Sequence, residues 1–283
     1  MRFNLVHILP DPRLHGLRGY EEVIETVRWG LAELGHDVTI EINTVRSDRR
    51  NILFGFQMLT EPTLRAMPAD TIVCNFEQMA RVPQEKLLPM VRTAAMRLQI
   101  WDYSQANIAA WRALNPAHEP LHVPIGFAPT LLRIPRRVQD IDVLFYGAPG
   151  EARLRIFGEI ASRGITSMFA CGLYGAARDE LIARSKLVLN LNRLDTTRIF
   201  EAVRVSYLLA NAKAVVSDFH PESIIEPDFR DAVAFASPDQ IPSLCVRLVE
   251  DDSLRRRLEA LGPQVMRRRD IRPILANVIA QTS

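Results

Sequence analysis

Residues 3–42 read FNLVHILPDPRLHGLRGYEEVIETVRWGLAELGHDVTIEI. The apolar run at residues 3–9 has the length of a buried strand, and a polar loop with two glycines follows it. Residues 20–34 then carry apolar side chains at helical spacing, Gly35 stops this helix, and residues 36–42 alternate as a strand does. This order of strand, helix and strand predicts the first unit of a parallel sheet.

The alternation continues along the chain and restarts once. Before the restart we expect strands at residues 51–57, 70–75 and 97–101 and helices at 83–95 and 104–114, the second with a serine cap. The proline- and arginine-rich stretch PIGFAPTLLRIPRRVQD at residues 124–140 then marks a boundary. After it we expect strands at 142–146, 166–170, 187–191 and 214–217 and helices at 151–162, 178–184, 198–209, 241–249, 253–261 and 272–280.

The pattern predicts an α/β protein with two doubly wound, Rossmann-like domains that face a cleft. Residues 1–130 form the first domain, residues 131–265 form the second, and a C-terminal helix at 266–283 packs back on the first. Sheets of this kind bind ligands beyond the carboxyl ends of their strands, where helix N-termini attract anions. Polar residues just after strands are therefore the first candidates for a site.

The composition of the chain limits the kinds of partner and compartment that we expect. The 283 residues carry 35 Lys and Arg against 33 Asp and Glu, a net charge of +2, which lacks the basic excess of a general nucleic-acid binder. No apolar run is long enough to span a bilayer and no signal-peptide pattern is present, so we expect a cytoplasmic protein, either free or peripheral at the inner face of the membrane. Cys74, Cys171 and Cys245 are far apart in apolar runs, which predicts buried thiols in a reducing compartment.

Four residues of the first half follow predicted strands. Gly16 and Gly19 would let backbone N–H groups approach an acceptor or a phosphate, or they only permit the turn. Glu77 follows the strand DTIVCN and Asp102 follows RLQIW, so both carboxylates are expected at the same sheet edge as candidate general bases. The alternatives are a solvated loop for Glu77 and a helix cap for Asp102.

In the second half, residues 196–218 (TTRIFEAVRVSYLLANAKAVVSD) are the most informative. They predict a helix with Glu201 and Arg204 on one face among apolar residues. Ionised groups in such surroundings either pair with each other or meet a ligand. A glutamate can accept ribose hydroxyls and an arginine can bind a diphosphate, so a nucleotide is the ligand that these two residues favour.

Other signals point away from metal chemistry and leave membrane contact open. The chain has no Walker loop, HExxH, GxSxG or DxD cluster, and its six histidines do not cluster, so we expect no metal and no cofactor. Basic runs at residues 255–257 and 267–269 are either a solvated helical face or a docking surface for an anionic membrane.

Residues 200–218 (FEAVRVSYLLANAKAVVSD) are similar to the sugar-nucleotide-binding segment of glycosyltransferases with the GT-B fold, where an acidic residue on the helix holds the donor ribose. Residues 15–40 also look like the first loop, helix and second strand of such enzymes. Registered on the AVV strand, the family's two glutamates would fall at Ile199 and Tyr207. The common motif of retaining enzymes is therefore absent, and Glu201 is displaced from it.

The chain resembles bacterial spore-maturation-type and polysaccharide-associated glycosyltransferases more closely. The shared features are an Arg-x-Phe-Glu helix start, a strand that ends in aromatic-Gly and a Leu-Asn element before the helix. The resemblance implies a donor site formed by Tyr146, Gly147, Asn192, Arg198, Glu201 and Arg204.

The expected function is a metal-independent transfer of a sugar from a nucleotide-sugar to a glycan, glycolipid or other acceptor, with Glu77 ahead of Asp102 as the acceptor-side base. The alternatives are a nucleotide-sugar epimerase of the same fold and a non-catalytic module that binds nucleotide-sugars or glycans. A nucleic-acid partner is not expected.

Overall fold

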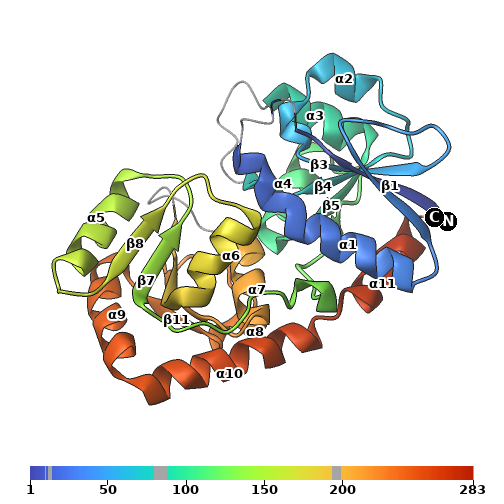
Figure 1. The fold of residues 1–283 in the computed structure, drawn as a ribbon. Helices are drawn as coiled ribbons and strands as arrows, with labels where there is room; N and C mark the ends of the chain where they lie inside the picture. The colour runs from blue at the N-terminus through green and yellow to red at the C-terminus, as the bar shows by residue number, and fades with distance from the viewer. Residues whose placement is uncertain (10, 12–14, 80–87, 193–198, 283) are drawn as a thin grey trace. The chain divides into compact units, whose positions relative to one another are not determined.

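The computed structural model describes residues 1–9, 11, 15–79, 88–192 and 199–282 (Figure 1). The chain forms two compact units. Unit 1 comprises Met1–Ala128 together with Asp270–Ser283, and unit 2 is the continuous segment Pro129–Arg269. The last helix therefore belongs to the same unit as the first strand.

Unit 1 contains a six-stranded parallel sheet with the order β2-β1-β3-β4-β5-β6. Its strands are β1 (Arg2–His7), β2 (Asp37–Ile42), β3 (Arg50–Phe54), β4 (Ile72–Asn75), β5 (Gln99–Asp102) and β6 (Leu121–His122). Its helices are η1 (His15–Tyr20), α1 (Glu21–Glu33), η2 (Phe56–Met58), α2 (Glu61–Arg65), α3 (Leu88–Arg97), α4 (Gln105–Leu114) and α11 (Ile271–Gln281).

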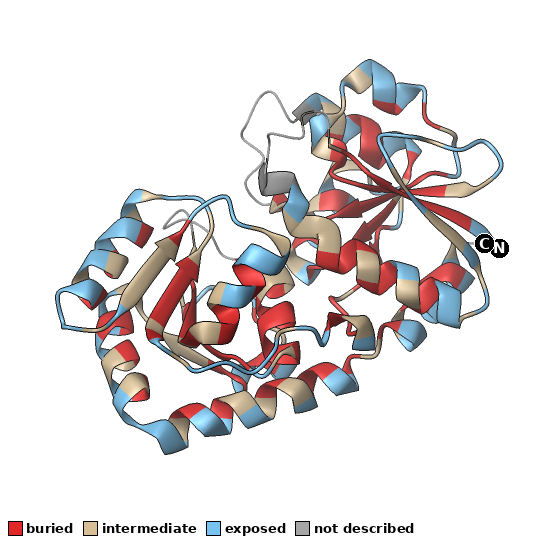
Figure 2. Cartoon of the chain, in the orientation of Figure 1, coloured by how far each residue is buried: buried red, intermediate tan, exposed pale blue. Residues whose placement is uncertain are grey.

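Helices cover both faces of the unit 1 sheet, and its strands β1, β3, β4 and β5 are largely buried, whereas the edge strand β2 is not (Figure 2). On one face, Val6, Leu53 and Val73 pack with apolar residues of α3 and α4. Helix α1 packs against α11, which comes from the other end of the chain (Figure 1). Gly35 has a φ of 80°, a left-handed conformation that suits glycine, and it ends the α1 segment as predicted.

Unit 2 contains a five-stranded parallel sheet with the order β11-β10-β9-β7-β8. Its strands are β7 (Ile141–Tyr146), β8 (Ser167–Ala170), β9 (Ser185–Asn190), β10 (Ala214–Asp218) and β11 (Val233–Ala236). Its helices are η4 (Pro129–Leu131), α5 (Glu151–Ala161), α6 (Gly175–Arg184), α7 (Ala202–Ala210), α8 (Pro227–Arg230), η5 (Pro238–Gln240), α9 (Ile241–Glu250) and α10 (Asp252–Arg268). Apolar residues of β7, β9 and β10 pack with α5 and α9 in one core.

The strand order reverses once in each sheet. In unit 1 the chain goes from β1 to β2 on one side and then returns to β3 on the other side of β1. In unit 2 it goes from β7 to β8 and then returns to β9 on the other side of β7. The loops after the two central strands diverge at such a point and leave a crevice for ligands at the carboxyl edge. We therefore expect ligand sites at the carboxyl ends of β1 and β3 (the β1/β3 edge) and of β7 and β9 (the β7/β9 edge).

The predicted parallel α/β class is confirmed, and several elements differ in detail. The strand predicted at 51–57 ends at Phe54, and the short helices α2 and α8 were not predicted. The helix predicted at 198–209 begins at Ala202, because Ile199 instead forms an extended bridge with Ile224. The short strands β6, of two residues, and β11, of four residues, were not predicted. Cys171 is exposed beyond the end of β8, whereas Cys74 and Cys245 are buried as predicted.

The C-terminal basic runs are partly buried in unit 2. Arg255 is 4% exposed and lies 2.5 Å from Asp252, while Arg269 is 7% exposed and pairs with Glu226 and Asp228 at 2.8 and 2.9 Å. Each run thus contributes a structural ion pair and is not a wholly solvated face. Within the described ranges, no helix has both the length and the apolar character needed to cross a bilayer.

The close packing of α10 on α7 gives a test of the unit 2 core. A Cβ at Gly262 would lie 2.9 Å from the carbonyl oxygen of Leu209, a backbone atom that cannot move aside. We expect Gly262→Ala to lower the free energy of unfolding by about 2 kcal/mol in urea denaturation. The control is Gly158→Ala in α5, where a Cβ meets nothing within 4 Å, so helix propensity should raise stability by about 0.5–1 kcal/mol. Equal effects of the two substitutions would contradict this packing.

Candidate functional site

The β7/β9 edge of unit 2 begins with a glycine turn. Gly147 follows Tyr146, the last residue of β7, and donates its N–H to the carbonyl of Ala170 at 2.9 Å. Its φ is 144°, and a Cβ at this position would lie 3.3 Å from Nη2 of Arg204. Both the backbone conformation and the space therefore favour glycine, and the turn brings main chain close to a guanidinium.

Arg204 extends from α7 to this turn and is held by uncharged groups. Its Nη1 donates to Oδ1 of Asn190, the last residue of β9, at 3.3 Å, and its guanidinium carbon lies 5.2 Å from the ring centroid of Tyr146. In the part of the chain that the structure describes, Arg204 has no carboxylate within 4 Å. A half-buried cation at a sheet edge without a counter-ion is suited to bind an anionic ligand.

Glu201 occupies the position just before α7 and makes no capping hydrogen bond. Within the described residues it pairs neither with Arg204 nor with another side chain, so the alternative of a structural Glu201–Arg204 pair does not hold. Arg198, the other predicted arginine, lies outside the described residues. The half-buried carboxylate of Glu201 is thus available as a hydrogen-bond acceptor.

A buried arginine that sequence reasoning missed connects the loops at this edge. Arg153 of α5 is 6% exposed and donates from Nε and Nη2 to the carbonyl of Leu191 at 3.0 and 2.6 Å. Its Nη1 donates to the carbonyl of Ala148 at 2.8 Å. Arg153 therefore joins the loop after β7 to the loop after β9. Its place inside an amphipathic helix gave no signal of this role.

Asn192 and Asp218 meet where β9 and β10 end. The N–H of Asn192 donates to Oδ2 of Asp218 at 2.9 Å, whereas Oδ1 of Asp218 is buried and has no hydrogen-bond partner among the residues that the structure describes. Burial raises the pKa of Asp218 to about 6, against the lowering effects of Asn192 and Arg153. Sequence reasoning missed Asp218, although a carboxylate directly after the apolar run AVVS is the same signal that selected Glu77 and Asp102.

At the carboxyl edge of unit 1, Glu77 forms a three-residue cluster. Its Oε1 accepts a hydrogen bond from the hydroxyl of Tyr20 at 2.7 Å and another from Nε2 of Gln57 at 2.9 Å. Gln57 Nε2 also donates to the Tyr20 hydroxyl oxygen at 3.0 Å. One carboxylate oxygen is thereby fixed by two neutral donors, while Oε2 keeps its capacity to accept a hydrogen bond.

The partners of Glu77 come from the segments that follow β1 and β3. Tyr20 ends η1, the same 3₁₀ helix that contains Gly16 and Gly19, and Gln57 lies in η2. The helix that contains the two predicted glycines thus ends in the tyrosine whose hydroxyl donates to Glu77. Neither Tyr20 nor Gln57 was predicted, because a lone tyrosine or glutamine has no distinctive spacing.

Asp102 lies deeper, with its side chain fully buried at the end of β5. Its oxygens accept hydrogen bonds from Asn75, the N–H of Ser104, Asn107 and Trp111, at 2.6–3.0 Å. In the described part of the chain it has no cationic partner, and burial raises its pKa to about 6. Asp102 accepts the N–H of Ser104, the residue just before α4, and Ser104 makes no side-chain capping bond, so the predicted serine cap is wrong.

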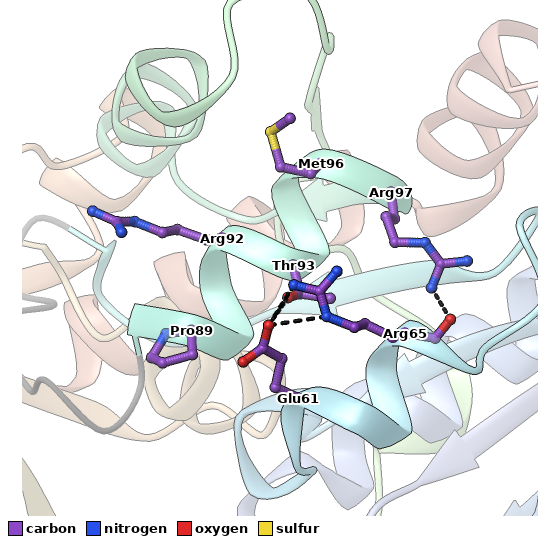
Figure 3. A pocket seen from close by; sticks show the side chains of 7 residues that line it. All are labelled: Glu61, Arg65, Pro89, Arg92, Thr93, Met96 and Arg97. Carbon is purple, nitrogen blue, oxygen red and sulfur yellow. Dashed lines mark hydrogen bonds and ion pairs between the residues drawn. The ribbon is translucent and has the colours of Figure 1, made fainter.

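A separate groove of about 590 Å³ lies between α2 and α3 (Figure 3). In it Glu61 accepts hydrogen bonds from Arg65 and Thr93, and Arg97 donates to the carbonyls of α2. None of the predicted site residues lines this groove. Within the described ranges, no three His, Cys, Asp or Glu residues are grouped so that they could hold a metal ion.

The raised pKa of Asp102 predicts a pH dependence of stability. Because the native pKa of about 6 exceeds the unfolded value near 3.8, the native state holds an extra proton between these values. The contribution of Asp102 to the free energy of unfolding therefore falls as the pH rises through this window. In urea denaturation, we expect the advantage of wild type over Asp102→Asn in free energy of unfolding to be about 2 kcal/mol greater at roughly pH 4 than at pH 7. A difference that stays constant, or grows with pH, would contradict the raised pKa.

No protein-family model matches the chain. It is similar to Uncharacterized protein L140 of Acanthamoeba polyphaga mimivirus, with 26% identity over 177 residues that cover 60% of this chain and 56% of L140. The chain thus spans little more than half of that relative. L140 is viral and uncharacterized, so it supports neither a bacterial origin nor a role in polysaccharide biosynthesis.

Solved structures resemble the chain over nearly its whole length. Anabaena Alr3699/HepE in complex with UDP-glucose gives a TM-score of 0.62 at 11% identity, covering 99% of this chain and 100% of that chain. T4 phage BGT in complex with its UDP-glucose substrate gives 0.60 at 12% identity, covering 100% and 99%. At such identities the likeness concerns the fold, and it confirms the predicted resemblance to GT-B glycosyltransferases.

Proposed function

We propose that this protein transfers a sugar from a nucleotide-sugar donor to a glycan, glycolipid or other acceptor without a resident metal ion. The observation that carries the proposal is Arg204, a cation without a carboxylate partner among the described residues, set against the Gly147 turn at the β7/β9 edge. The fold supports it, since the similar structures of HepE and T4 BGT hold UDP-glucose.

The donor diphosphate would lie on Arg204 and the loop that follows Gly147. This loop leads into α5, an eleven-residue helix. Its N-cap residue is Gly150, which has no side chain to accept hydrogen bonds from the first N–H groups of the helix. Its first N–H groups and its dipole favour a negative charge. Arg204 would add charge-assisted hydrogen bonds as the leaving diphosphate gains charge, which is the contribution that a metal ion makes elsewhere.

The sugar-nucleotide's ribose would be held by Glu201. A carboxylate can accept hydrogen bonds from both ribose hydroxyls, and Glu201 stands at the start of the helix that carries Arg204. Tyr146 and Asn192 would line the same site, and Arg198 is the second candidate for the diphosphate. In this arrangement Arg153 acts on the site by holding its two loops together.

Glu77 would serve the acceptor. In the reaction, the acceptor hydroxyl oxygen attacks the anomeric carbon, its proton passes to Glu77, and the electron pair of the broken C–O bond leaves on the diphosphate. The hydrogen bonds from Tyr20 and Gln57 to Oε1 orient the carboxylate and leave Oε2 as the proton acceptor.

Ligand-induced stabilisation tests the donor site. We expect one of UDP, GDP, CDP, ADP and dTDP to raise the melting temperature, with about 2.7 kcal/mol of stabilisation at a hundredfold excess over Kd. Arg204→Ala and Glu201→Ala should each weaken binding about tenfold or more, because each removes charge-assisted hydrogen bonds. The measurement is a thermal-shift titration of the three proteins.

The matched control is Arg155→Ala, which removes an exposed arginine of α5 that pairs with Glu159. It should leave the titration unchanged. A nucleotide that stabilises wild type, Arg204→Ala and Glu201→Ala equally binds elsewhere, and the β7/β9 edge is then not the donor site. No shift with any nucleotide contradicts the proposed function.

Glu77→Gln tests the acceptor-side role. The amide keeps the size of the carboxylate but cannot take a proton, so we expect kcat for transfer to fall by about a hundredfold. The measurement is nucleotide release from the identified donor with and without a panel of saccharide acceptors. The donor-binding shift should be unchanged, since it reports on unit 2. Full transfer activity in Glu77→Gln would remove this residue from the mechanism.

A further inference from the structure

We infer that Asp102 is a positioning residue that fixes the loop bearing Glu77, acting through the side-chain amides of Asn75 and Asn107. The inference rests on the proposed acceptor-side role of Glu77 for its functional meaning, but its structural basis is separate. It assigns Asp102 a task different from the general base that its place after β5 predicted.

The two asparagines are the links. Asn75 donates from Nδ2 both to Oδ2 of Asp102 at 2.6 Å and to the carbonyl of Glu77 at 2.9 Å. Asn107 donates from Nδ2 both to Oδ1 of Asp102 at 3.0 Å and to the same carbonyl at 2.8 Å. Each amide nitrogen therefore has one hydrogen on the buried carboxylate and the other on the loop.

The side-chain oxygens of Asn75 and Asn107 also bind the loop, by accepting hydrogen bonds from its main-chain N–H groups. Oδ1 of Asn75 accepts the N–H of Glu77 at 3.1 Å, and Oδ1 of Asn107 accepts the N–H of Met79 at 2.8 Å. Asp102, Asn75 and Asn107 are all at most 1% exposed, so water does not replace a lost partner. Three main-chain groups of the loop thus depend on two amides that share one acceptor.

The carboxylate of Asp102 sets which way each amide points. An ionised carboxylate only accepts hydrogen bonds, so it attracts the nitrogen ends and directs the oxygen ends to the N–H groups of Glu77 and Met79. Four donors surround Asp102, and two come from elsewhere: the N–H of Ser104 and Nε1 of Trp111. Each oxygen of Asp102 accepts from one asparagine and one of these other donors, so the NH2 group of an asparagine at position 102 would face one such pair, and the asparagine of that pair would lose its partner or flip.

The experiment compares Asp102→Asn with Trp111→Phe by amide hydrogen exchange and by transfer kinetics. Trp111→Phe removes one hydrogen bond to Asp102 and some core volume but leaves both asparagines on the loop. We expect the main-chain amides of Glu77 and Met79 to exchange about tenfold faster in Asp102→Asn, as for one lost buried hydrogen bond, and to stay within about twofold of wild type in Trp111→Phe. Equal exchange of these amides in the two variants overturns the inference.

The kinetic readout separates the inference from the proposed function. With the donor found by thermal shift, Asp102→Asn should raise the acceptor KM or lower kcat about tenfold and leave the donor KM unchanged, whereas Trp111→Phe changes none of these. If Glu77→Gln impairs transfer and Asp102→Asn does not, the inference is wrong. If the loop loosens in Asp102→Asn while Glu77→Gln transfers normally, Asp102 positions the loop and the proposed role of Glu77 fails.

If Asp102→Asn fails to fold, Asn107→Ala tests the same series of hydrogen bonds, because it removes the side chain that connects Asp102 to the loop. It leaves Asp102 with three donors and removes the acceptor of the Met79 N–H. The Met79 amide should then exchange about tenfold faster, while Asn75 still protects Glu77. Full protection of Met79 in Asn107→Ala overturns the inference.

Discussion

The reversal of strand order next to the central strand of each sheet is the constraint on which both candidate sites depend. In a parallel sheet all strands end at one edge, and only where neighbouring connections diverge does that edge open. The reversal lies between β1 and β3 in unit 1 and between β7 and β9 in unit 2. Tyr20 and Gln57 follow the first pair, and Gly147 and Asn190 mark the ends of the second pair.

The two edges hold their charges in the same way but with opposite sign. Arg204 is held by an amide oxygen and an aromatic ring, and Glu77 is held by a phenol and an amide nitrogen. Neutral partners orient an ion without cancelling its charge, so the ion remains able to act on a ligand. Elsewhere in unit 2, Arg255 and Arg269 meet carboxylates and serve the packing of α10.

The sequence was sufficient for the fold and for the candidate residues that directly follow a strand. Periodicity predicts parallel strands, and the end of a parallel strand is the one place where a sequence position implies a sheet edge. Glu77 and Asp102 were predicted in this way, whereas Tyr146 came from the family resemblance. Asp218 also follows an apolar strand directly, but it was not selected as a candidate. Glu201 was misplaced onto a helical face, because the bridge between Ile199 and Ile224, which delays the helix, joins segments that no local pattern relates.

Other residues could not have been found without coordinates, since their roles depend on contacts between distant segments. Arg153 looks like any polar residue of an amphipathic helix, yet it binds carbonyls of two different loops. Asn75 and Asn107 are thirty-two positions apart and share one carboxylate. Hydrogen bonds of this kind leave no periodic trace in the sequence, so burial and geometry are needed to see them.

The structure also accounts for the glutamates that this chain lacks relative to the GT-B enzymes that it resembles. Ile199, where the first would fall, is buried and bridges to Ile224. Tyr207, where the second would fall, is buried as well, and its hydroxyl donates to Asp179 at 2.8 Å and accepts from Arg133 at 3.0 Å. A carboxylate at position 207 would face that of Asp179 and repel it, so this network excludes the second glutamate. At the start of α7, Glu201 then remains as the acidic side chain for a donor ribose, which concentrates the test of ribose binding on this residue.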